Sequence, residues 1–247
     1  MLTAIDRGEG AAVVMLPSLG RGAADFDDLG SRLVDAGYRA IAFDPPEALF
    51  PGAGMADLAT LVVGRLDELG VDRCHMVGHA FGNRWARAFT AAQPDRVVSL
   101  TLLAAGGLIE PEPDIHLSLI SLFDLDAPEA ERLAHIDKVF FAEGHDASIW
   151  LDGWFPLAAA IEGEATTTTP IESWWSAAPE QVLVVQGLQD VCAVPENGRR
   201  YVAELIDRGV DGRLVELDGA GHALLPEQPD AVADAVVGFL REVDGTA

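Results

Sequence analysis

Short apolar runs that alternate with helical patterns are the feature of this sequence that most constrains its fold. Six runs predict strands, at residues 12–16, 39–43, 73–77, 97–103, 182–186 and 213–217. Several are apolar at nearly every position, as expected for strands that are buried on both faces of a sheet. Between the runs, apolar residues recur at helical spacing, for example Leu58, Val62 and Leu66. This alternation predicts an α/β fold in which a mainly parallel sheet carries helices on both faces.

The stretch from residue 111 to residue 175 breaks this alternation. Its pattern predicts helices alone, at residues 115–123, 128–142 and 148–164, followed by a polar run at 166–169. A helical insertion between two strands of a parallel sheet lies above the carboxyl ends of the strands, where ligands bind. We therefore predict a core, residues 1–110 and 176–247, that carries an inserted helical lid or cap, residues 111–175.

The charge of the chain excludes several classes of partner. Its 247 residues carry 16 Lys plus Arg against 40 Asp plus Glu, a formal net charge of −24. This charge repels nucleic acid phosphates and anionic lipid surfaces, so neither is an expected partner. No apolar run approaches the ~20 residues that cross a bilayer, and the chain opens on no secretory leader. We expect a cytoplasmic protein whose partner is a small molecule, with a homodimer as a candidate assembly.

The chain has two cysteines, Cys74 and Cys192. They are too few for a disulfide framework, and their spacing does not fit a paired-cysteine metal site. We expect both thiols to be unbridged, because Cys74 begins one predicted strand whereas Cys192 follows the end of another. In a parallel sheet those two positions lie at opposite edges, too far apart for a disulfide. The histidines show no metal-binding spacing, and the chain has no dinucleotide or phosphate-binding glycine motif. We therefore expect neither a metal nor a cofactor.

The segment from Gly78 to Gly82 carries the most specific signal for function. It reads Gly-His-Ala-Phe-Gly, follows a predicted strand and opens a predicted helix. A sharp strand-to-helix turn needs both glycines, because a side chain at either place would collide with the neighbouring backbone. This is the frame of the nucleophile elbow, Gly-x-Ser-x-Gly, with Ala80 at the position of the serine. With this motif the chain resembles the α/β-hydrolase fold family, from about residue 11 to its end.

The resemblance also implies an acid and a base. The turn that ends in Asp190 follows a predicted strand and is similar to the turn that carries the acid of the family's catalytic triad. The loop that ends in His222 is similar to the family's histidine loop, and the order of position 80, Asp190 and His222 matches the family order. Glu110 is the alternative acid, because some members take theirs from the end of the preceding strand.

The family's oxyanion loop corresponds to the early turn at residues 16–20. By this match, the backbone N–H groups of Leu19 and Phe81 form the oxyanion hole. Pro17 and Ser18 replace the usual His-Gly of that loop. We interpret Ser18 as a turn serine that bonds to its own backbone, with a substitute nucleophilic hydroxyl as the alternative. We interpret His79 as structural, and the short N-terminus predicts that the family's first antiparallel hairpin is truncated or absent.

Ala80 governs the interpretation of function. A methyl group cannot attack a carbonyl carbon, so this chain cannot form an acyl-enzyme at that position and is predicted to be inactive as a serine hydrolase. Two explanations remain open, an engineered Ser→Ala change and a natural sequence that dispenses with the nucleophile. In the second, His222 held by Asp190 acts as a general base on substrate or water, as in the cofactor-independent members of this fold.

Aromatic residues of the predicted lid suggest a pocket for a bulky ligand. Four of the five tryptophans lie there, and with one phenylalanine they are the predicted substrate-binding residues: Trp150, Trp154, Phe155, Trp174 and Trp175. Packing of the lid is the alternative for Trp150 and Trp154, which lie four residues apart on one helical face. Further candidates for the lining are Met15, Phe140 and Phe141. The acidic surface of the lid would repel anionic substrates.

These observations support three hypotheses about function. The first is a hydrolase of the α/β-hydrolase family that acts on an ester, lactone or related carbonyl compound with a hydrophobic or aromatic body. The second is a lyase, a cyclase or a dioxygenase-like enzyme that uses the His222–Asp190 dyad without a covalent step. The third is a small-molecule receptor that keeps the pocket and the lid but has no turnover. In every case we expect the His222 ring to pair with Asp190 and to face Ala80 across a cleft beneath the lid.

Overall fold

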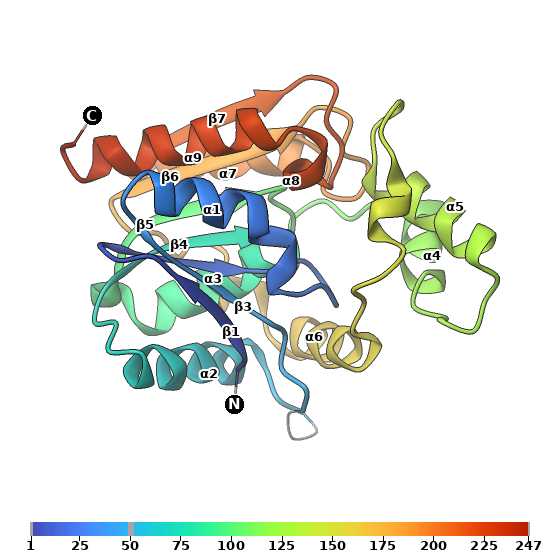
Figure 1. Ribbon diagram of the computed structural model, residues 1–247, viewed down its shortest axis with the longest axis horizontal. Coiled ribbons are helices and arrows are strands. Elements are labelled where there is room, and N and C mark those ends of the chain that lie inside the picture. The colour runs from blue at the N-terminus through green and yellow to red at the C-terminus, as the bar shows by residue number, and fades with distance from the viewer. Residues whose placement is uncertain (1, 49–51, 247) are drawn as a thin grey trace.

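A seven-stranded sheet forms the centre of the computed structural model, which describes residues 2–48 and 52–246 (Figure 1). The strand order is β1-β3-β2-β4-β5-β6-β7, and strands β2 to β7 are parallel, as predicted. One short edge strand, β1, pairs antiparallel with β3. The family's first antiparallel hairpin, which we predicted to be truncated or absent, is thus reduced to this single strand. The strands are β1 (Ala4–Arg7), β2 (Ala12–Leu16), β3 (Arg39–Phe43), β4 (Cys74–His79), β5 (Val97–Leu103), β6 (Gln181–Gly187) and β7 (Asp211–Leu217).

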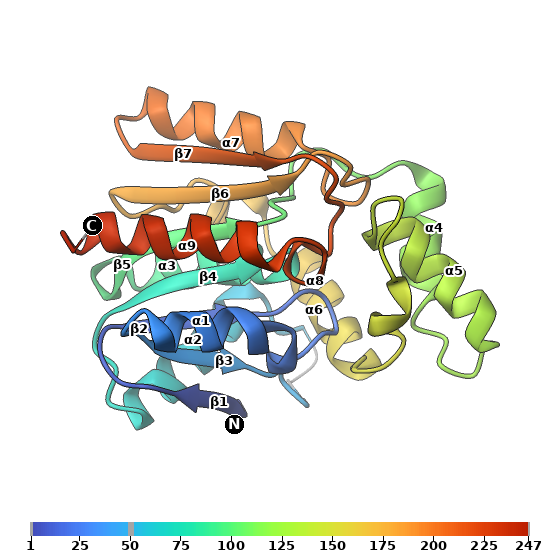
Figure 2. The ribbon, with the colours of Figure 1, turned by 45° about the horizontal axis from the view of Figure 1, so that its top comes forward.

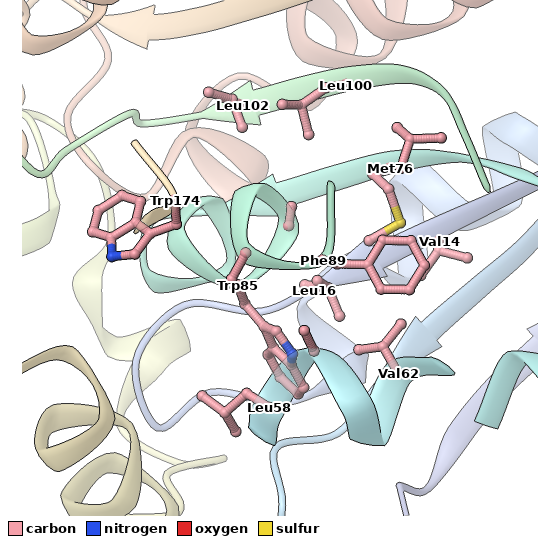
Figure 3. Close-up of a cluster of buried hydrophobic side chains, with 14 of the residues drawn as sticks. Val14, Leu16, Leu58, Val62, Met76, Trp85, Phe89, Leu100, Leu102 and Trp174 are labelled. Carbon is pink, nitrogen blue, oxygen red and sulfur yellow. The ribbon is translucent and has the colours of Figure 1, made fainter. Parts of the chain in front are cut away.

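Helices cover both faces of the sheet (Figures 1 and 2). Helices α1 (Asp27–Asp35) and α9 (Pro229–Val243) lie on one face, whereas α2 (Met55–Glu68), α3 (Phe81–Ala92) and α7 (Glu196–Asp207) lie on the other. Strand β2 is apolar throughout because its successive side chains point to opposite faces of the sheet and both faces are buried. Val13 and Met15 pack in the cluster of α1 and α9, while Val14 and Leu16 pack against α2 and α3. Figure 3 shows Val14 and Leu16 among the side chains of these two helices.

The helical insertion between β5 and β6 lies beyond the carboxyl ends of the parallel strands (Figures 1 and 2). Its helices are α4 (Pro113–Ser121), α5 (Glu129–Phe140) and α6 (Pro156–Thr168). The insertion has an apolar cluster of its own, which includes Leu122, Ile136 and Trp150 and reaches the core at Ala223. The predicted boundaries of the lid, residues 111–175, remain a prediction, but the insertion stands where the sequence pattern placed it.

The predicted helix at residues 148–164 is interrupted in the structure. A short 3₁₀ turn, Ala147–Trp150, is followed by irregular chain, and α6 begins only at Pro156. Gly153 has a φ of +81°, which breaks the helix, and Pro156 suits a first helical position because it has no N–H to leave unpaired. The polar run at 166–169 is mostly helical, because hydroxyls such as that of Thr166 donate to carbonyls of the preceding turn.

The remaining helical segments are short, at Ala23–Phe26, Pro94–Arg96, Ile171–Ser173 and α8 (Leu224–Glu227). Within the described residues, no helix combines the length and the apolar character that crossing a membrane requires. Both cysteines are free, as predicted. Cys74 begins β4 at the amino edge of the sheet, whereas Cys192 follows β6 at the carboxyl edge.

Candidate active site

The turn between β4 and α3 holds Ala80 in a strained conformation. Its φ of +52° and ψ of −108° lie where a non-glycine residue costs about 1–3 kcal/mol. The backbone N–H of Ala80 donates to the carbonyl oxygen of Leu103 at 2.9 Å and ties the turn to β5. A Cβ atom at Gly78 would lie 2.3 Å from the oxygen of Gly82, and one at Gly82 would lie 2.0 Å from the oxygen of Leu16. Only glycine fits at both positions, as the motif predicted.

A histidine–carboxylate pair lies at the ends of β6 and β7. The Nδ1 atom of His222 is 2.9 Å from Oδ2 of Asp190, and both side chains are buried. The other carboxylate oxygen, Oδ1, accepts from the backbone N–H groups of Cys192 (2.9 Å) and Ala193 (2.7 Å). Because the carboxylate accepts a hydrogen bond from Nδ1–H, Nε2 of the neutral ring carries the free lone pair and can accept a proton. Asp190, and not Glu110, is therefore the acid that pairs with His222 in this structure.

A fully buried glutamine, Gln186, supports this acid, although no motif in the sequence predicted it. Nε2 of Gln186 donates to Oδ2 of Asp190 at 3.1 Å and to the carbonyl oxygen of Ala193 at 2.9 Å. Oε1 of the same side chain accepts from the backbone N–H of Ala105 at 3.0 Å, which links β6 to the end of β5. A polar residue inside the apolar run of β6 is the signal that could have identified it, because a buried amide needs partners of this kind.

The helical insertion helps to fix the histidine loop. The backbone N–H of His222 donates to the carbonyl oxygen of Phe140, at the end of α5, at 2.8 Å. The carboxylate of Glu227 accepts from the backbone N–H groups of Ala142 (2.6 Å) and Gly221 (2.8 Å), one on each side of this contact. Burial raises the pKa of Glu227, and these two hydrogen bonds oppose that shift. The position of His222 therefore depends on the insertion as well as on the core.

His79 lies beneath the pair and makes no contact with solvent. Its Nε2–H donates to the carbonyl oxygen of His222 at 2.8 Å, and the two ring centres are 5.5 Å apart. Burial lowers the pKa of His79 to about 3, so its ring is neutral at physiological pH. The structure thus places this side chain in a position to hold the backbone of the histidine loop.

A cavity of about 310 Å³ lies in front of the pair and is lined by His222, Ala80, Leu19 and Phe81. The backbone N–H groups of Leu19 and Phe81 donate no hydrogen bond to any residue in the described part of the chain. Two unpaired amides beside an imidazole can bind a carbonyl oxygen and stabilise the negative charge that develops on it during attack. These four residues were all predicted for the site. Asp190, the fifth, lies behind His222, so the structure brings five of the predicted residues together.

The predicted aromatic substrate residues lie elsewhere. None of the five lines this cavity, and Trp150 and Trp154 instead cover the guanidinium of Arg21. The central carbon of that group lies 4.6 and 4.7 Å from their ring centres, a cation–π arrangement. Arg21 also pairs with Asp25 at 2.6 Å and donates to the carbonyl oxygen of Asp152 at 2.7 Å. These two tryptophans therefore fasten the insertion to the core.

The other two tryptophans surround a second buried arginine. The guanidinium of Arg87 lies 4.9 Å from the ring centre of Trp174, 4.5 Å from that of Trp175 and 5.0 Å from that of Tyr201. The indole N–H of Trp175 donates to Oε2 of Glu204 at 2.8 Å. The number of tryptophans in a segment does not reveal what each ring contacts, and in this structure the four rings contact arginines and do not line the cavity.

Of the remaining aromatic and sulfur-containing candidates, Phe140 alone lines the cavity. Met15 belongs to the core between the sheet and helices α1 and α9. Phe141 packs with Trp150 in the apolar cluster of the insertion. Phe155 is 40 % exposed and is joined by its backbone N–H to the carbonyl oxygen of Gly20.

Comparison with known proteins identifies the family. Residues 13–235 match the sequence profile of the family described as "Alpha/beta hydrolase family". The chain belongs to the alpha/beta hydrolase family. It is similar to two 2-hydroxy-6-oxo-6-phenylhexa-2,4-dienoate hydrolases. The one from Comamonas testosteroni is 28% identical over 96% of this chain and 90% of that protein. The one from Burkholderia cepacia is 34% identical over 92% and 79%.

Other relatives and solved structures agree with this alpha/beta hydrolase assignment. A 2-hydroxy-6-oxononadienedioate/2-hydroxy-6-oxononatrienedioate hydrolase of Klebsiella pneumoniae is 32% identical over 57% of this chain. That match spans only 54% of the relative's own length. The enol-lactonase from Burkholderia xenovorans LB400 has a TM-score of 0.79 at 20% identity, over 97% of this chain and 96% of that one. A putative non-heme bromoperoxidase from Mycobacterium tuberculosis H37Rv has a TM-score of 0.81 at 21% identity, over 98% and 96%. At such identities the structures show the alpha/beta hydrolase fold alone.

Cys192 and Ser18 of this alpha/beta hydrolase cavity carry groups that can act as nucleophiles. Cys192 lines the cavity, but burial and the nearby Asp190 raise the pKa of its thiol, which keeps it protonated and weakly nucleophilic. Ser18 also lines the cavity and is 2% exposed. Its hydroxyl makes no hydrogen bond to a described residue, so the predicted bond to its own backbone is not observed. Within residues 2–48 and 52–246, no cluster of three His, Cys, Asp or Glu side chains is placed to hold a metal ion.

Proposed function

We propose that the cavity binds an ester, a lactone or a related carbonyl compound and that His222 acts on it as the general base. The observation that carries this proposal is the 2.9 Å contact between His222 and Asp190, at a cavity that both unpaired amides also line. In this proposal the N–H groups of Leu19 and Phe81 bind the carbonyl oxygen, and Asp190 holds the ring with Nε2 towards the substrate. The relatives named as hydrolases support a hydrolytic reaction.

Ala80 decides which form of this chemistry is open to the chain. Without a hydroxyl at position 80 there is no covalent acyl-enzyme, so His222 takes its proton from a water molecule or from the substrate itself. Water then attacks the carbonyl carbon directly, and the two amides stabilise the resulting oxyanion. A natural alanine and an engineered Ser→Ala change lead to the same chemistry in this chain. They differ in the meaning of a serine at this position, which would restore the original activity after an engineered change and would create a new one in a natural alanine protein.

The substrate that we propose has a hydrophobic or aromatic body. Apolar side chains such as Phe81, Ile109, Leu119 and Phe140 line the cavity, and its volume of about 310 Å³ suits a small molecule. Helices α4 and α6 contribute lining residues, which supports the proposal that the insertion acts as a lid. The named substrates of the relatives, unsaturated keto acids with an enol group and in one case a phenyl group, are carbonyl compounds of this kind.

Turnover of an aryl ester and a lactone tests the proposal. Phenyl acetate and dihydrocoumarin are incubated with the protein, with His222→Gln and with the control His135→Gln, whose side chain does not line the cavity. We expect slow hydrolysis that His222→Gln lowers by about 10²–10⁴-fold, the usual contribution of a general base, and that His135→Gln preserves. Equal rates in the protein and in His222→Gln would contradict the proposal. Saturable binding without any turnover would favour the receptor hypothesis.

Location and assembly complete the proposal. A cytoplasmic protein agrees with its two unbridged thiols, because reducing compartments keep cysteines in this form. A homodimer is retained as the candidate assembly, and light scattering after size-exclusion chromatography measures it directly. A mass of one chain would contradict the dimer and would leave the proposed chemistry unchanged, because every residue invoked above belongs to a single chain.

A further inference from the structure

An unpaired arginine lines the same cavity. Arg84 stands on α3, one helical turn beyond Ala80, and its side chain borders the cavity together with His222. All other basic side chains except Arg73 and Arg241 donate a hydrogen bond to a described residue. Those two are exposed to solvent, whereas Arg84 is partly buried. Arg84 is thus the one arginine or lysine side chain that is both withdrawn from water and without a partner among the described residues.

The surroundings of Arg84 do not neutralise it. Burial lowers the pKa of the guanidinium, and Glu110, which lines the same cavity, opposes this shift without forming an ion pair with Arg84. The ring of Trp174 lies 6.0 Å from the central carbon of the group and covers it from another side. A guanidinium that is removed from water without an anion beside it destabilises the protein. An anionic group supplied by a ligand would relieve this cost.

We propose that Arg84 binds the carboxylate of the cavity's ligand, so that the preferred ligands are monocarboxylic acids with a hydrophobic body. The inference rests on the proposed function, because it assigns the reacting carbonyl of the same molecule to the space beside His222 and Ala80. A planar guanidinium can donate two parallel hydrogen bonds to a carboxylate, which fixes the orientation of the ligand. Glu110 lines the same cavity and would repel a second carboxylate, which is why one negative charge is favoured over two.

This inference changes the expectation drawn from the acidic insertion. The overall charge of −24 repels anions at long range, but such repulsion between exposed charges is screened by salt. Among the described residues that line the cavity, Arg84 is the only arginine or lysine, so it is the group to which a carboxylate can bind directly. Selectivity for an acid over its neutral analogue would therefore be set by this side chain and not by the surface of the insertion.

Calorimetric titration with two matched probes tests the assignment. We use 3-phenylpropanoate and 3-phenylpropanamide, which have nearly the same shape and differ by one negative charge. The protein is expected to bind the acid at least about 10-fold more tightly than the amide, as a charge-assisted hydrogen bond requires. Arg84→Met should abolish this preference and Arg84→Lys should retain part of it. The control Arg73→Met removes the same charge from an exposed position and should leave the preference unchanged.

Three results would overturn the assignment. They are equal binding of acid and amide to the unaltered protein, no detectable binding of the acid, and the same loss of preference in Arg84→Met and Arg73→Met. The first two use the unaltered chain, so they hold even if Arg84→Met fails to fold. Hydrolysis of neutral esters without any preference for the acid would refute the inference alone. An acid preference that depends on Arg84, in a protein without turnover, would refute the proposed function alone.

Discussion

The buried carboxyl group of Glu162 makes the stability of this protein depend on pH. Glu162 lies on α6 and is completely buried, with Oε2 accepting from the backbone N–H of Gly20 at 2.8 Å. Its other oxygen, Oε1, has no hydrogen-bond partner among the described residues. Burial raises the pKa of Glu162 from 4.5 to about 8, and the hydrogen bond from Gly20 opposes this shift. The folded protein therefore holds a proton on this group at neutral pH, next to the loop that carries Leu19.

The direction and the size of the effect follow from this shift. Between pH 4.5 and about pH 8 the unfolded chain has released the proton that the folded chain keeps, so the free energy of unfolding falls as pH rises. At about 1.4 kcal/mol per pH unit, the whole window corresponds to an upper bound of about 5 kcal/mol. Relaxation around the carboxylate and entry of water would lower this value. We expect about 2–3.5 kcal/mol to be lost between pH 5 and pH 8, because only part of the window lies within this range.

Denaturant unfolding of Glu162→Gln at several pH values measures this effect. Glutamine keeps an acceptor for the N–H of Gly20 but cannot ionise. We therefore expect Glu162→Gln to lose less unfolding free energy between pH 5 and pH 8 than the unaltered protein, by the amount given above. The exposed Glu172→Gln is the control and should follow the unaltered protein. His79 and Glu227 also titrate with shifted pKa values, but both are common to all three proteins and cancel in the difference. Equal pH slopes in the protein and in Glu162→Gln would refute the reasoning.

Two further predictions concern the elbow and the anchor of the insertion. Gly82→Ala should destabilise the protein by more than about 2 kcal/mol in denaturant unfolding, because the new Cβ would collide with backbone atoms. The control Gly64→Ala lies in an open helical position and should not destabilise the protein. Equal effects of the two changes would contradict the elbow geometry. Arg21→Met should cost about 3–5 kcal/mol, because it leaves Asp25 buried without its partner, whereas the exposed Arg7→Met should cost less than about 1 kcal/mol. A small loss for Arg21→Met would show that the tryptophan stack does not fasten the insertion.

The sequence was informative where one physical constraint decides the structure. Strands buried on both faces must be apolar throughout, so β2 to β6 could be located from their composition, whereas the edge strand β7 is only partly buried. The edge strand β1 was not predicted, because two of its four residues, Asp6 and Arg7, are charged and exposed and the strand has no apolar run. The glycines at 78 and 82 were predictable because the backbone passes too close for any side chain.

The site was predictable in part, for a similar reason. Carboxyl ends of parallel strands meet at one edge of the sheet, which brings Asp190 and His222 together from distant parts of the chain. Partners that depend on the tertiary packing of side chains could not be inferred in this way. Nothing in the spacing of the tryptophans reveals that they cover Arg21 and Arg87, and nothing near Arg84 in the sequence shows that it lacks a partner.

Covalent labelling of Ala80→Ser with a fluorophosphonate tests most directly whether the chain carries a hydrolase site that lacks only the oxygen of its nucleophile. We expect this variant to be labelled at position 80 and to hydrolyse an activated hydrophobic ester, while the unaltered chain is not labelled. Adding His222→Ala should abolish both properties, because the members of a triad act as a unit and losing one removes rate on the order of 10⁶-fold. A well-folded Ala80→Ser protein with no label, no burst and no turnover would contradict the account.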